Sequence, residues 1–278
     1  MKKPRRWLYP TGVERDYNRA LQRQVVDPFV ASCREHLLPA LPVIFAQARQ
    51  DADIRDIPEG TGWFETLRQA LVTTLVQMGL DDQTITAIVA QVAASVDTFN
   101  EAQFHAVLRS VYGVDILTGA PPGLRAALSS WEVQNIQLIK SIPVESLGRM
   151  QNKIVNALQT GQTMRDTQKA IVEEFGVASR RAELIARDQV GKLNGQLTEL
   201  RQTDIGVDSY VWRGVLDSRE RPEHVAREGQ VFRWDQPPDD GHPGQPIQCR
   251  CIAEPVLPSW EDLEQRFTGV RPPPGTYR

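Results

Sequence analysis

Helical periodicity stops near Gly206, and this change divides the chain more sharply than any other feature of its sequence. From Val13 to about residue 205, apolar residues recur at steps of three and four, the spacing of amphipathic helices. The segment Tyr210–Val256 lacks that period and holds two of the six Trp and two of the three Cys, together with turn-forming Gly, Pro and Asp. The sequence therefore predicts a mainly α fold with a small C-terminal α+β module, in which helices pack on a short antiparallel sheet.

Proline and glycine predict where the helices end. Pro143 is predicted to end a helix that begins at Leu124, and Gly176 to end a short helix that starts at the capping pair Thr163 and Asp166. Breaks or helix starts are also predicted within residues 13–57, near Pro28, Pro39 and Pro42. Gly79 is predicted to end another helix, Asp81 to cap the one after it, and Ser179 to cap the helix after Gly176. This last helix is expected to bury one stripe of residues, namely Ala186, Val190, Leu193, Leu197 and Leu200.

These boundaries predict five parts of the chain. They are a basic N-terminal arm (1–12), a helical N-terminal domain (13–112), a Gly/Pro-rich linker (113–123), a second domain (124–257), and a short helix with a Pro-rich tail (258–278). The second domain divides into helices at 124–205 and a strand-rich module at 206–257.

Three strands are predicted in the module, at Tyr210–Leu216, Gln230–Trp234 and Ile247–Pro255, with a polar turn or short helix at Asp217–Arg227. Because side chains alternate along a strand, Tyr210 and Trp212 should share one face. By the same alternation Cys249 and Cys251 should point one way and Arg250 the other.

Composition excludes several classes of protein. With 278 residues, 41% hydrophobic and 24% charged, the chain is long enough for a sizeable core. Its formal net charge of −3 argues against a dedicated DNA-coating protein. Three Cys do not make a disulfide framework, which favours synthesis in a reducing compartment. We find no apolar run of the roughly 18–20 residues that a membrane span needs, and no signal-peptide core.

The basic N-terminus has two interpretations. Lys2, Lys3, Arg5 and Arg6 are a solvated tail, or they dock on an acidic protein surface or nucleic acid with Trp7 and Tyr9 as anchors. Of the two anchors, Trp7 is the candidate for partner binding. Trp7 and the four basic residues are together the candidate partner-binding residues.

An ordered signature runs through the C-terminal segment. It reads D-x-R-x-R-x-x-H, then G-x-V-F, then H-P-G-x-P-I-x-C-R-C, and contains Asp217, Arg219, Arg221, His224, Gly229, Val231, Phe232, His242, Pro243, Gly244, Pro246, Ile247, Cys249, Arg250 and Cys251. Together with upstream motifs at Trp131–Pro143 and Ala182–Asp188, it resembles the phage Mu F-like head morphogenesis proteins over about half the chain.

That resemblance implies a minor head protein of a tailed bacteriophage or prophage, acting in procapsid assembly at or near the portal vertex. The implied partners are the portal protein, the inner face of the major capsid protein and scaffold protein, with only weak non-specific DNA contact. The implied location is the capsid interior of the virion, after synthesis in the host bacterial cytoplasm. No cofactor and no membrane partner are expected.

Three hypotheses compete for the polar residues of the signature. The first is a zinc site made by His224, His242, Cys249 and Cys251, since zinc takes four His or Cys ligands. Many members of the resembled family carry C-x-x-C where this chain has Arg221 and His224, so one implied ligand is lost here. His242 also lies seven residues before Cys249 instead of three.

The second hypothesis is catalysis by a Cys–His pair or a metal-dependent nuclease, which would make the protein a nuclease or ADP-ribosyltransferase-like effector. The sequence shows no third group to orient such a site, so no enzyme and no catalytic residue are predicted. The third hypothesis is a structural, metal-free constellation of Asp217, Arg219, Arg221, His224, Gly229, Cys249, Arg250 and Cys251, and it is the preferred one. Asp217 would accept backbone N–H bonds and pair with Arg219 and Arg250, and Arg221 would pair with Asp217 or Glu228.

Overall fold

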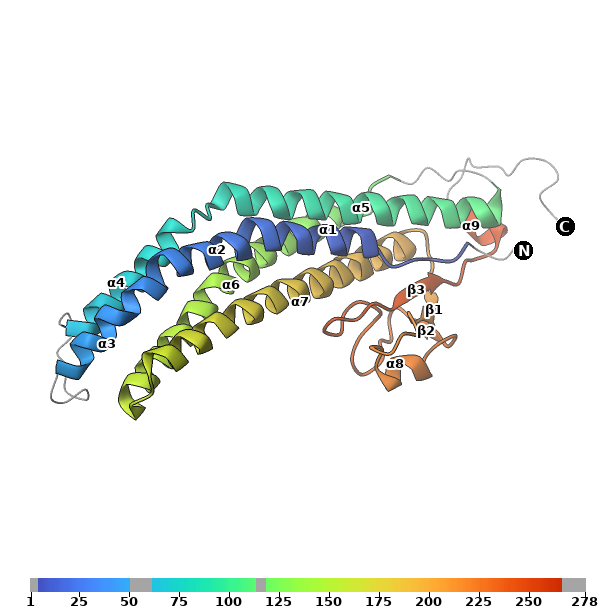
Figure 1. Cartoon of the computed structure of the whole chain (residues 1–278). Helices are drawn as coiled ribbons and strands as arrows, with labels where there is room; N and C mark the ends of the chain where they lie inside the picture. The colour runs from blue at the N-terminus through green and yellow to red at the C-terminus, as the bar shows by residue number, and fades with distance from the viewer. Residues whose placement is uncertain (1–4, 51–61, 114–118, 267–278) are drawn as a thin grey trace. The chain divides into compact units, whose positions relative to one another are not determined.

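The computed structural model describes residues 5–50, 62–113 and 119–266 (Figure 1). Its α-helices are α1 (Thr11–Leu21), α2 (Asp27–Ser32), α3 (Leu41–Gln50), α4 (Gly62–Gln77), α5 (Asp82–Tyr112), α6 (Leu124–Thr160), α7 (Met164–Asp204), α8 (Pro222–Ala226) and α9 (Trp260–Arg266). Its strands are β1 (Ser209–Arg213), β2 (Val231–Arg233) and β3 (Ile252–Pro255). Helix makes up 72% of the described residues and the strands form one small antiparallel sheet, which confirms the predicted fold class.

Residues 11–50 form a continuous helical stretch in which the prolines mark changes of helix type. π-helical turns at Gln22–Val26 and Cys33–Leu37 precede α2 and a 3₁₀ turn (Leu38–Ala40). Pro28 and Pro39 lie in the first turn of the element that follows a π-helical turn, where a missing backbone N–H costs little. The prediction of breaks or helix starts near these prolines is confirmed in this form.

The same stretch, 11–50, is long and apolar enough to cross a membrane by length and composition, with a mean hydropathy of 1.3 over 18 residues. This corrects the expectation that no such run exists. Its large apolar side chains Leu21, Phe29 and Leu37 are nevertheless fully buried inside the protein. A core helix of a globular protein has the same properties.

Two predicted helix ends are wrong, because α6 and α7 run through them. Pro143 lies inside α6, where the fully buried Ile139 and Ile142 pack just before it. Packing of this face offsets the backbone hydrogen bond that proline removes. Likewise α7 continues through Gly176, between the buried Phe175 and Ala178, so Ser179 does not cap a new helix.

Other local predictions are confirmed. Gly79 adopts a positive φ of 68° at the end of α4, and Asp81 caps α5 by accepting the Thr84 N–H at 2.6 Å. Thr163 caps α7, since its hydroxyl accepts the Asp166 N–H at 3.1 Å and donates to that carboxylate at 2.7 Å. On α7 the predicted stripe is buried, with Leu200 only partly so.

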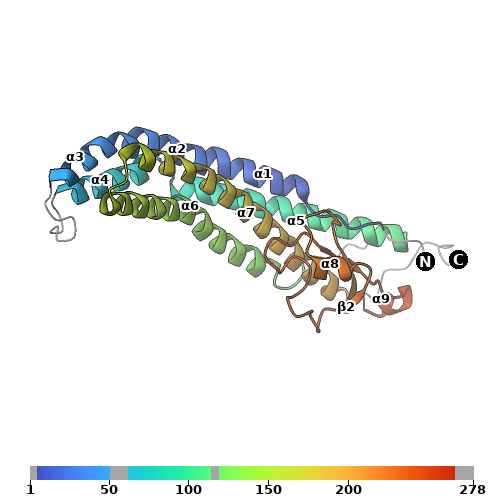
Figure 2. The same ribbon diagram turned by 60° about the horizontal axis from the view of Figure 1, so that its bottom comes forward.

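The chain forms two compact units, each drawing on segments far apart in the sequence. One comprises residues 17–88 and 135–185, within their described parts. In it α3 lies beside α4 in both views (Figures 1 and 2), and the Ser32 hydroxyl donates to the Thr74 carbonyl at 2.7 Å in the buried interior.

The other unit comprises the described parts of residues 1–16, 89–134 and 186–278 and contains the sheet. Its strand order is β2-β1-β3, with Tyr210 opposite Phe232 on one side and Pro255 on the other. As predicted, Tyr210 and Trp212 point to the same, fully buried face. Trp234, Ala253, Cys249 and Cys251 complete this small core.

The strands are shorter than predicted. β3 begins only at Ile252, so Cys249 and Cys251 lie in the loop before it and not within a strand. The proposed division at residues 113–123 stays a prediction, because part of that range lies outside the described residues. The two compact units each take segments from both sides of it.

Candidate functional site

A pocket of about 310 Å³ opens in the C-terminal module. It is lined by Arg187, Val215, Arg219, Glu220, Arg221, His224, Ile247, Gln248, Cys249, Arg250 and Cys251. Six of these residues belong to the arginine, histidine and cysteine positions of the sequence signature, so folding gathers much of the signature around one cavity.

The loop before β3 carries the two cysteines into this pocket. Gln248 has a positive φ of 57°, a conformation that costs a non-glycine residue on the order of 1 kcal/mol. Its backbone N–H donates to Asp188 Oδ1 on α7 at 2.8 Å, which holds the loop at this bend. The neighbouring Cys249 is therefore turned inward and is 4% exposed.

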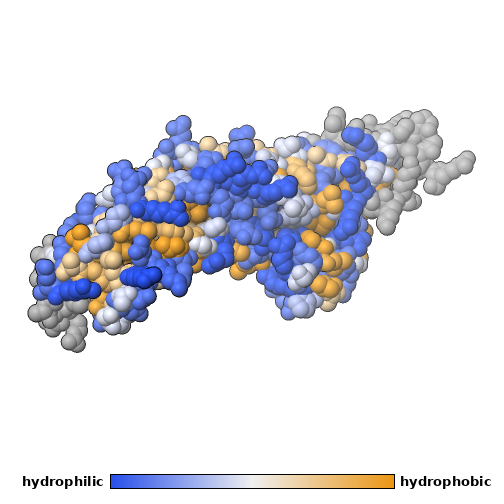
Figure 3. All heavy atoms as spheres, viewed as in Figure 1, coloured by the Kyte–Doolittle hydropathy of each residue, from blue (hydrophilic) through white to orange (hydrophobic). Residues whose placement is uncertain are grey.

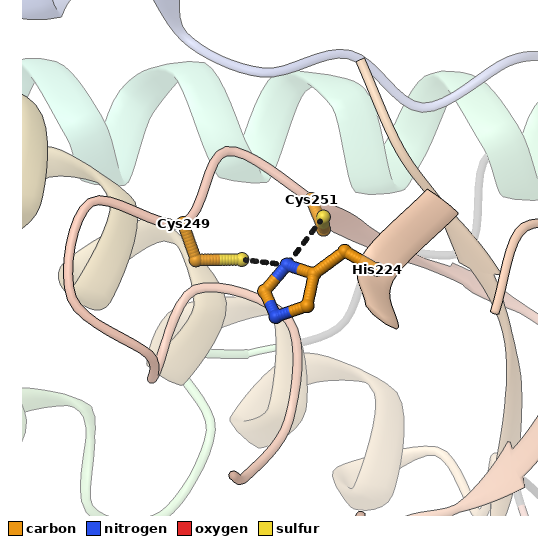
Figure 4. Close-up of side chains that lie close together, drawn as sticks. All are labelled: His224, Cys249 and Cys251. Carbon is orange, nitrogen blue, oxygen red and sulfur yellow. Dashed lines mark hydrogen bonds between the residues drawn. The ribbon is translucent and has the colours of Figure 1, made fainter. Parts of the chain in front are cut away.

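Three buried side chains converge at the pocket: His224 from α8 and the two thiols from the loop (Figure 4). His224 Nδ1 lies 3.6 Å from Cys249 Sγ and 3.4 Å from Cys251 Sγ. The other ring nitrogen, Nε2, lies 2.9 Å from Asp240 Oδ2, and Arg227 holds the second oxygen of that carboxylate at 2.5 Å. The imidazole is thus fixed from both sides.

Glu220 stands on the other side of Cys251. The Cys251 thiol donates to Glu220 Oε1 at 3.2 Å, and Glu220 also accepts the backbone N–H of Leu216. Gly214 makes room for this carboxylate, because a Cβ at that position would clash with it. The imidazole and two thiols thus share one small volume, with a carboxylate beside one of the thiols.

Hydrogen bonds set the ionisation of the thiols. Hydrogen bonds from Cys251 first, and then from His224 and the Gly244 N–H, outweigh burial and lower the pKa of Cys249 to about 5. The pKa of Cys251 is raised by its bond to Cys249 and by burial. The pKa of His224 is raised mainly by Cys249, and burial lowers the pKa of His242. Of the two thiols, Cys249 is the one that ionises.

His242 does not join this group, although the predicted ligand set included it. Its Nδ1 lies 2.8 Å from the Tyr210 hydroxyl, and its Nε2 lies 3.1 Å from the Trp234 carbonyl oxygen. Of the four zinc ligands considered from sequence, the structure brings three together. The described residues contain this one group of three or more potential metal ligands.

The contacts predicted for Asp217 are confirmed. It accepts the Arg219 N–H at 3.0 Å, lies 3.4 Å from the Arg219 guanidinium, and pairs with Arg250 at 2.7 Å. The pKa of Asp217 is held well below its usual range, chiefly by the Arg250 hydrogen bond. Gly229 has the positive φ that its turn requires, 78°.

Arg221 makes a different contact from the one predicted. Its guanidinium donates to the Ile247 carbonyl at 2.7 Å and thus ties the start of α8 to the cysteine loop. Glu228, one of its predicted partners, instead accepts the Gly214 N–H at 2.6 Å and pairs with Arg213. Arg221 contacts a carbonyl group, since Arg213 already pairs with Glu228 and Arg250 with Asp217.

Residues 149–254 match the family of phage Mu protein F like proteins. This Mu F-like segment contains the whole pocket and all three clustered ligands. The family implies a phage head protein and a component of the virion.

A protein of Haemophilus influenzae named only as an uncharacterized protein is 35% identical over 170 residues, which cover 60% of this chain. The chain spans 38% of the length of that relative. No solved structure matches the chain.

Outside the Mu F-like segment, the candidate partner-binding residues at the N-terminus differ in solvent exposure. Trp7 is 0% exposed and packs edge-on against Phe104, and Leu8 exchanges two backbone hydrogen bonds with the Gln103 side chain. Trp7 is therefore a core residue and cannot anchor a partner. Arg5 and Arg6 are exposed, and Lys2 and Lys3 lie outside the described residues.

Two residues of the site were missed from the sequence. Glu220 stands next to Arg221 in the signature and could have been weighed as a ligand. Asp240 lies in a Pro/Gly/Asp loop with no spacing signal, and only the fold places it behind His224. Asp240 also orients His224 beside Cys249, and thus supplies the third group of a Cys–His–Asp arrangement that could not be identified from the sequence. The expectation of no catalysis stays a prediction.

Proposed function

We propose that this protein is a minor head protein of a tailed bacteriophage or prophage, which acts in procapsid assembly at or near the portal vertex inside the capsid. The observation that carries the proposal is the match of residues 149–254 to the Mu F-like family. The portal protein and the inner face of the major capsid protein are the proposed partners, with scaffold protein as a further one.

The surface of the module supports a role in protein binding. Leu216, Val231 and Ile247 are 55%, 62% and 66% exposed, and Figure 3 shows apolar atoms on the visible face of this region. Ile247 lines the pocket, Leu216 directly follows the pocket residue Val215, and Val231 lies on the edge strand β2. Exposed apolar groups close together mark sites of protein association.

The first experiment measures incorporation into heads. Leu216→Glu with Ile247→Glu should reduce the amount of protein in purified procapsids by at least several-fold, because two buried charges would oppose an apolar contact. Val76→Glu, at a residue of α4 that is 66% exposed, is the matched control and should leave incorporation unchanged.

The vertex location is tested with heads assembled without portal protein, which should lack this protein. Equal incorporation into portal-free heads would contradict the location at the vertex, and absence from all heads would contradict the head-protein proposal.

The contribution of the basic N-terminus is tested by Arg5→Glu with Arg6→Glu and not by deleting residues 1–12, since that deletion also removes the buried Trp7. Host killing by the wild-type gene that His224→Ala abolishes would support an effector enzyme instead.

A further inference from the structure

We propose that His224 Nδ1, Cys249 Sγ and Cys251 Sγ, completed by the carboxylate of Glu220, bind one Zn²⁺ ion. The three nitrogen and sulfur donors lie within 4.8 Å of one another, and all three residues are buried. They come from two separate segments, α8 and the loop before β3, which a bound ion would join.

The distances match those of a zinc tetrahedron. Zinc–sulfur bonds of about 2.3 Å and zinc–nitrogen bonds of about 2.0–2.1 Å at tetrahedral angles place the two donor atoms about 3.6 Å apart. His224 Nδ1 lies 3.6 Å from one sulfur and 3.4 Å from the other. The nitrogen therefore already stands at the coordinated spacing from both sulfurs.

The direction of the imidazole favours an ion over hydrogen bonds. Nδ1 has a single in-plane lone pair or N–H, so it can make a well-aligned hydrogen bond to only one sulfur. In Figure 4 both thiols converge on that one nitrogen. An ion placed between the three atoms would satisfy all of them at once.

The surroundings of the donors are those that metal ligands need. An Nε2–H of His224 that donates to Asp240 at 2.9 Å leaves the Nδ1 lone pair free for an ion, and Arg227 fixes Asp240 in turn. The Gly244 N–H points to Cys249 Sγ at 3.4 Å, a bond that stabilises a thiolate.

Glu220 fills the fourth position. The sequence argued against zinc because Arg221 replaces one implied cysteine, but the structure turns Arg221 away to the Ile247 carbonyl. The adjacent residue supplies a carboxylate instead: Glu220 Oε1 lies 3.2 Å from Cys251 Sγ, and its side chain would turn toward His224 and Cys249 to complete the site. Two thiolates, one imidazole and one carboxylate suit zinc, whereas magnesium and calcium prefer oxygen ligands throughout.

The test uses the full chain, purified without chelators from zinc-supplemented cells. We expect about one zinc per chain by elemental analysis. The metal-free protein titrated with Co²⁺ should develop the thiolate charge-transfer and visible bands of a tetrahedral site, and Zn²⁺ should abolish them. Cys33→Ala, which removes a buried cysteine outside the group, should bind as the wild type does.

Variants separate ligands from residues that only stabilise the fold. Cys251→Ser should lose the ion, Asp240→Asn should bind it about 10–100-fold more weakly, and Glu220→Gln should shift the visible cobalt bands while circular dichroism shows a folded protein. A folded wild-type protein without zinc and without cobalt charge-transfer bands would overturn the proposal. A Glu220→Gln spectrum identical to the wild type would overturn Glu220 as the fourth ligand.

Discussion

Two glycines of α7, Gly191 and Gly195, let the loop that holds Cys249 pack directly against the helix backbone. A Cβ on Gly191 would lie 2.6 Å from the Cys249 carbonyl oxygen, and one on Gly195 would overlap the Pro243 carbonyl oxygen. The two glycines are one helical turn apart, so they open one continuous strip of α7 to the loop. This close approach sets the depth at which the thiols enter the pocket.

Gly195→Ala should therefore lower the free energy of unfolding by about 1–3 kcal/mol, since the loop must move off the helix. Gly148→Ala on α6 is the matched control, because a Cβ there meets nothing within 4 Å. It should raise the free energy of unfolding by about 0.4–1 kcal/mol. Urea unfolding measures both, and equal effects of the two substitutions would show that the loop does not press on α7.

Among the elements, α6 and α7 are joined by a nearly buried carboxylate. Glu174 of α7, 6% exposed, lies 2.8 Å from Arg149 and 2.9 Å from Lys153, which are four residues apart on α6. Burial by itself raises the pKa of Glu174, but hydrogen bonds from both cations outweigh it and lower the pKa overall. The carboxylate is thus held ionised between the two helices.

Because the pKa of Glu174 is lower in the folded than in the unfolded state, its stabilisation is complete above about pH 4.3, the unfolded value. The stabilisation is lost as the pH falls through the folded pKa. Glu174→Gln should cost about 1–3 kcal/mol at pH 7 and flatten the acid side of the stability profile. Glu173→Gln, at the exposed neighbouring residue, is the control and should keep the wild-type dependence of stability on pH. Thermal unfolding from pH 7 to 3 measures both variants.

At the scale of the whole molecule, the charge is slightly negative, and much of the positive charge on the described helix α7 is paired. Acidic residues exceed basic ones, 35 to 32. The basic run on α7 faces acidic partners, with Arg181 2.7 Å from Glu145, Arg187 3.3 Å from Glu14, and Lys192 2.7 Å from Asp188. These pairs leave few cations concentrated for a phosphate backbone.

Direct binding to duplex DNA should therefore be weak at physiological salt, with a dissociation constant no tighter than the roughly 10⁻⁴–10⁻⁶ M of non-specific binding. Each phosphate neutralised adds about 0.9 to the slope of log affinity against log salt, so we expect a slope of only a few units. Fluorescence titration at several salt concentrations measures both quantities. Tight binding with a steep slope would instead indicate a nucleic-acid surface on α7.

The sequence by itself determined the fold class and the small C-terminal sheet. Periods of 3.6 and 2 reflect which side chains a helix or strand buries, and caps such as Asp81 and Thr163 act within a few residues. The contacts of Asp217 with Arg219 and Arg250 could be predicted because opposite charges in one short module have few other partners. The ordered signature also indicated the Mu F-like family.

Only the tertiary structure decided whether a local signal was overridden. Pro143 and Gly176 stay inside helices because packing on either side outweighs a weak local preference, and Trp7 is buried because α5 covers it. Spacing along the chain could not show that His242 turns to Tyr210 while His224, Cys249 and Cys251 come together with Glu220 beside Cys251. That choice depends on how the cysteine loop rests on Gly191 and Gly195, residues that approach it only after the chain has folded.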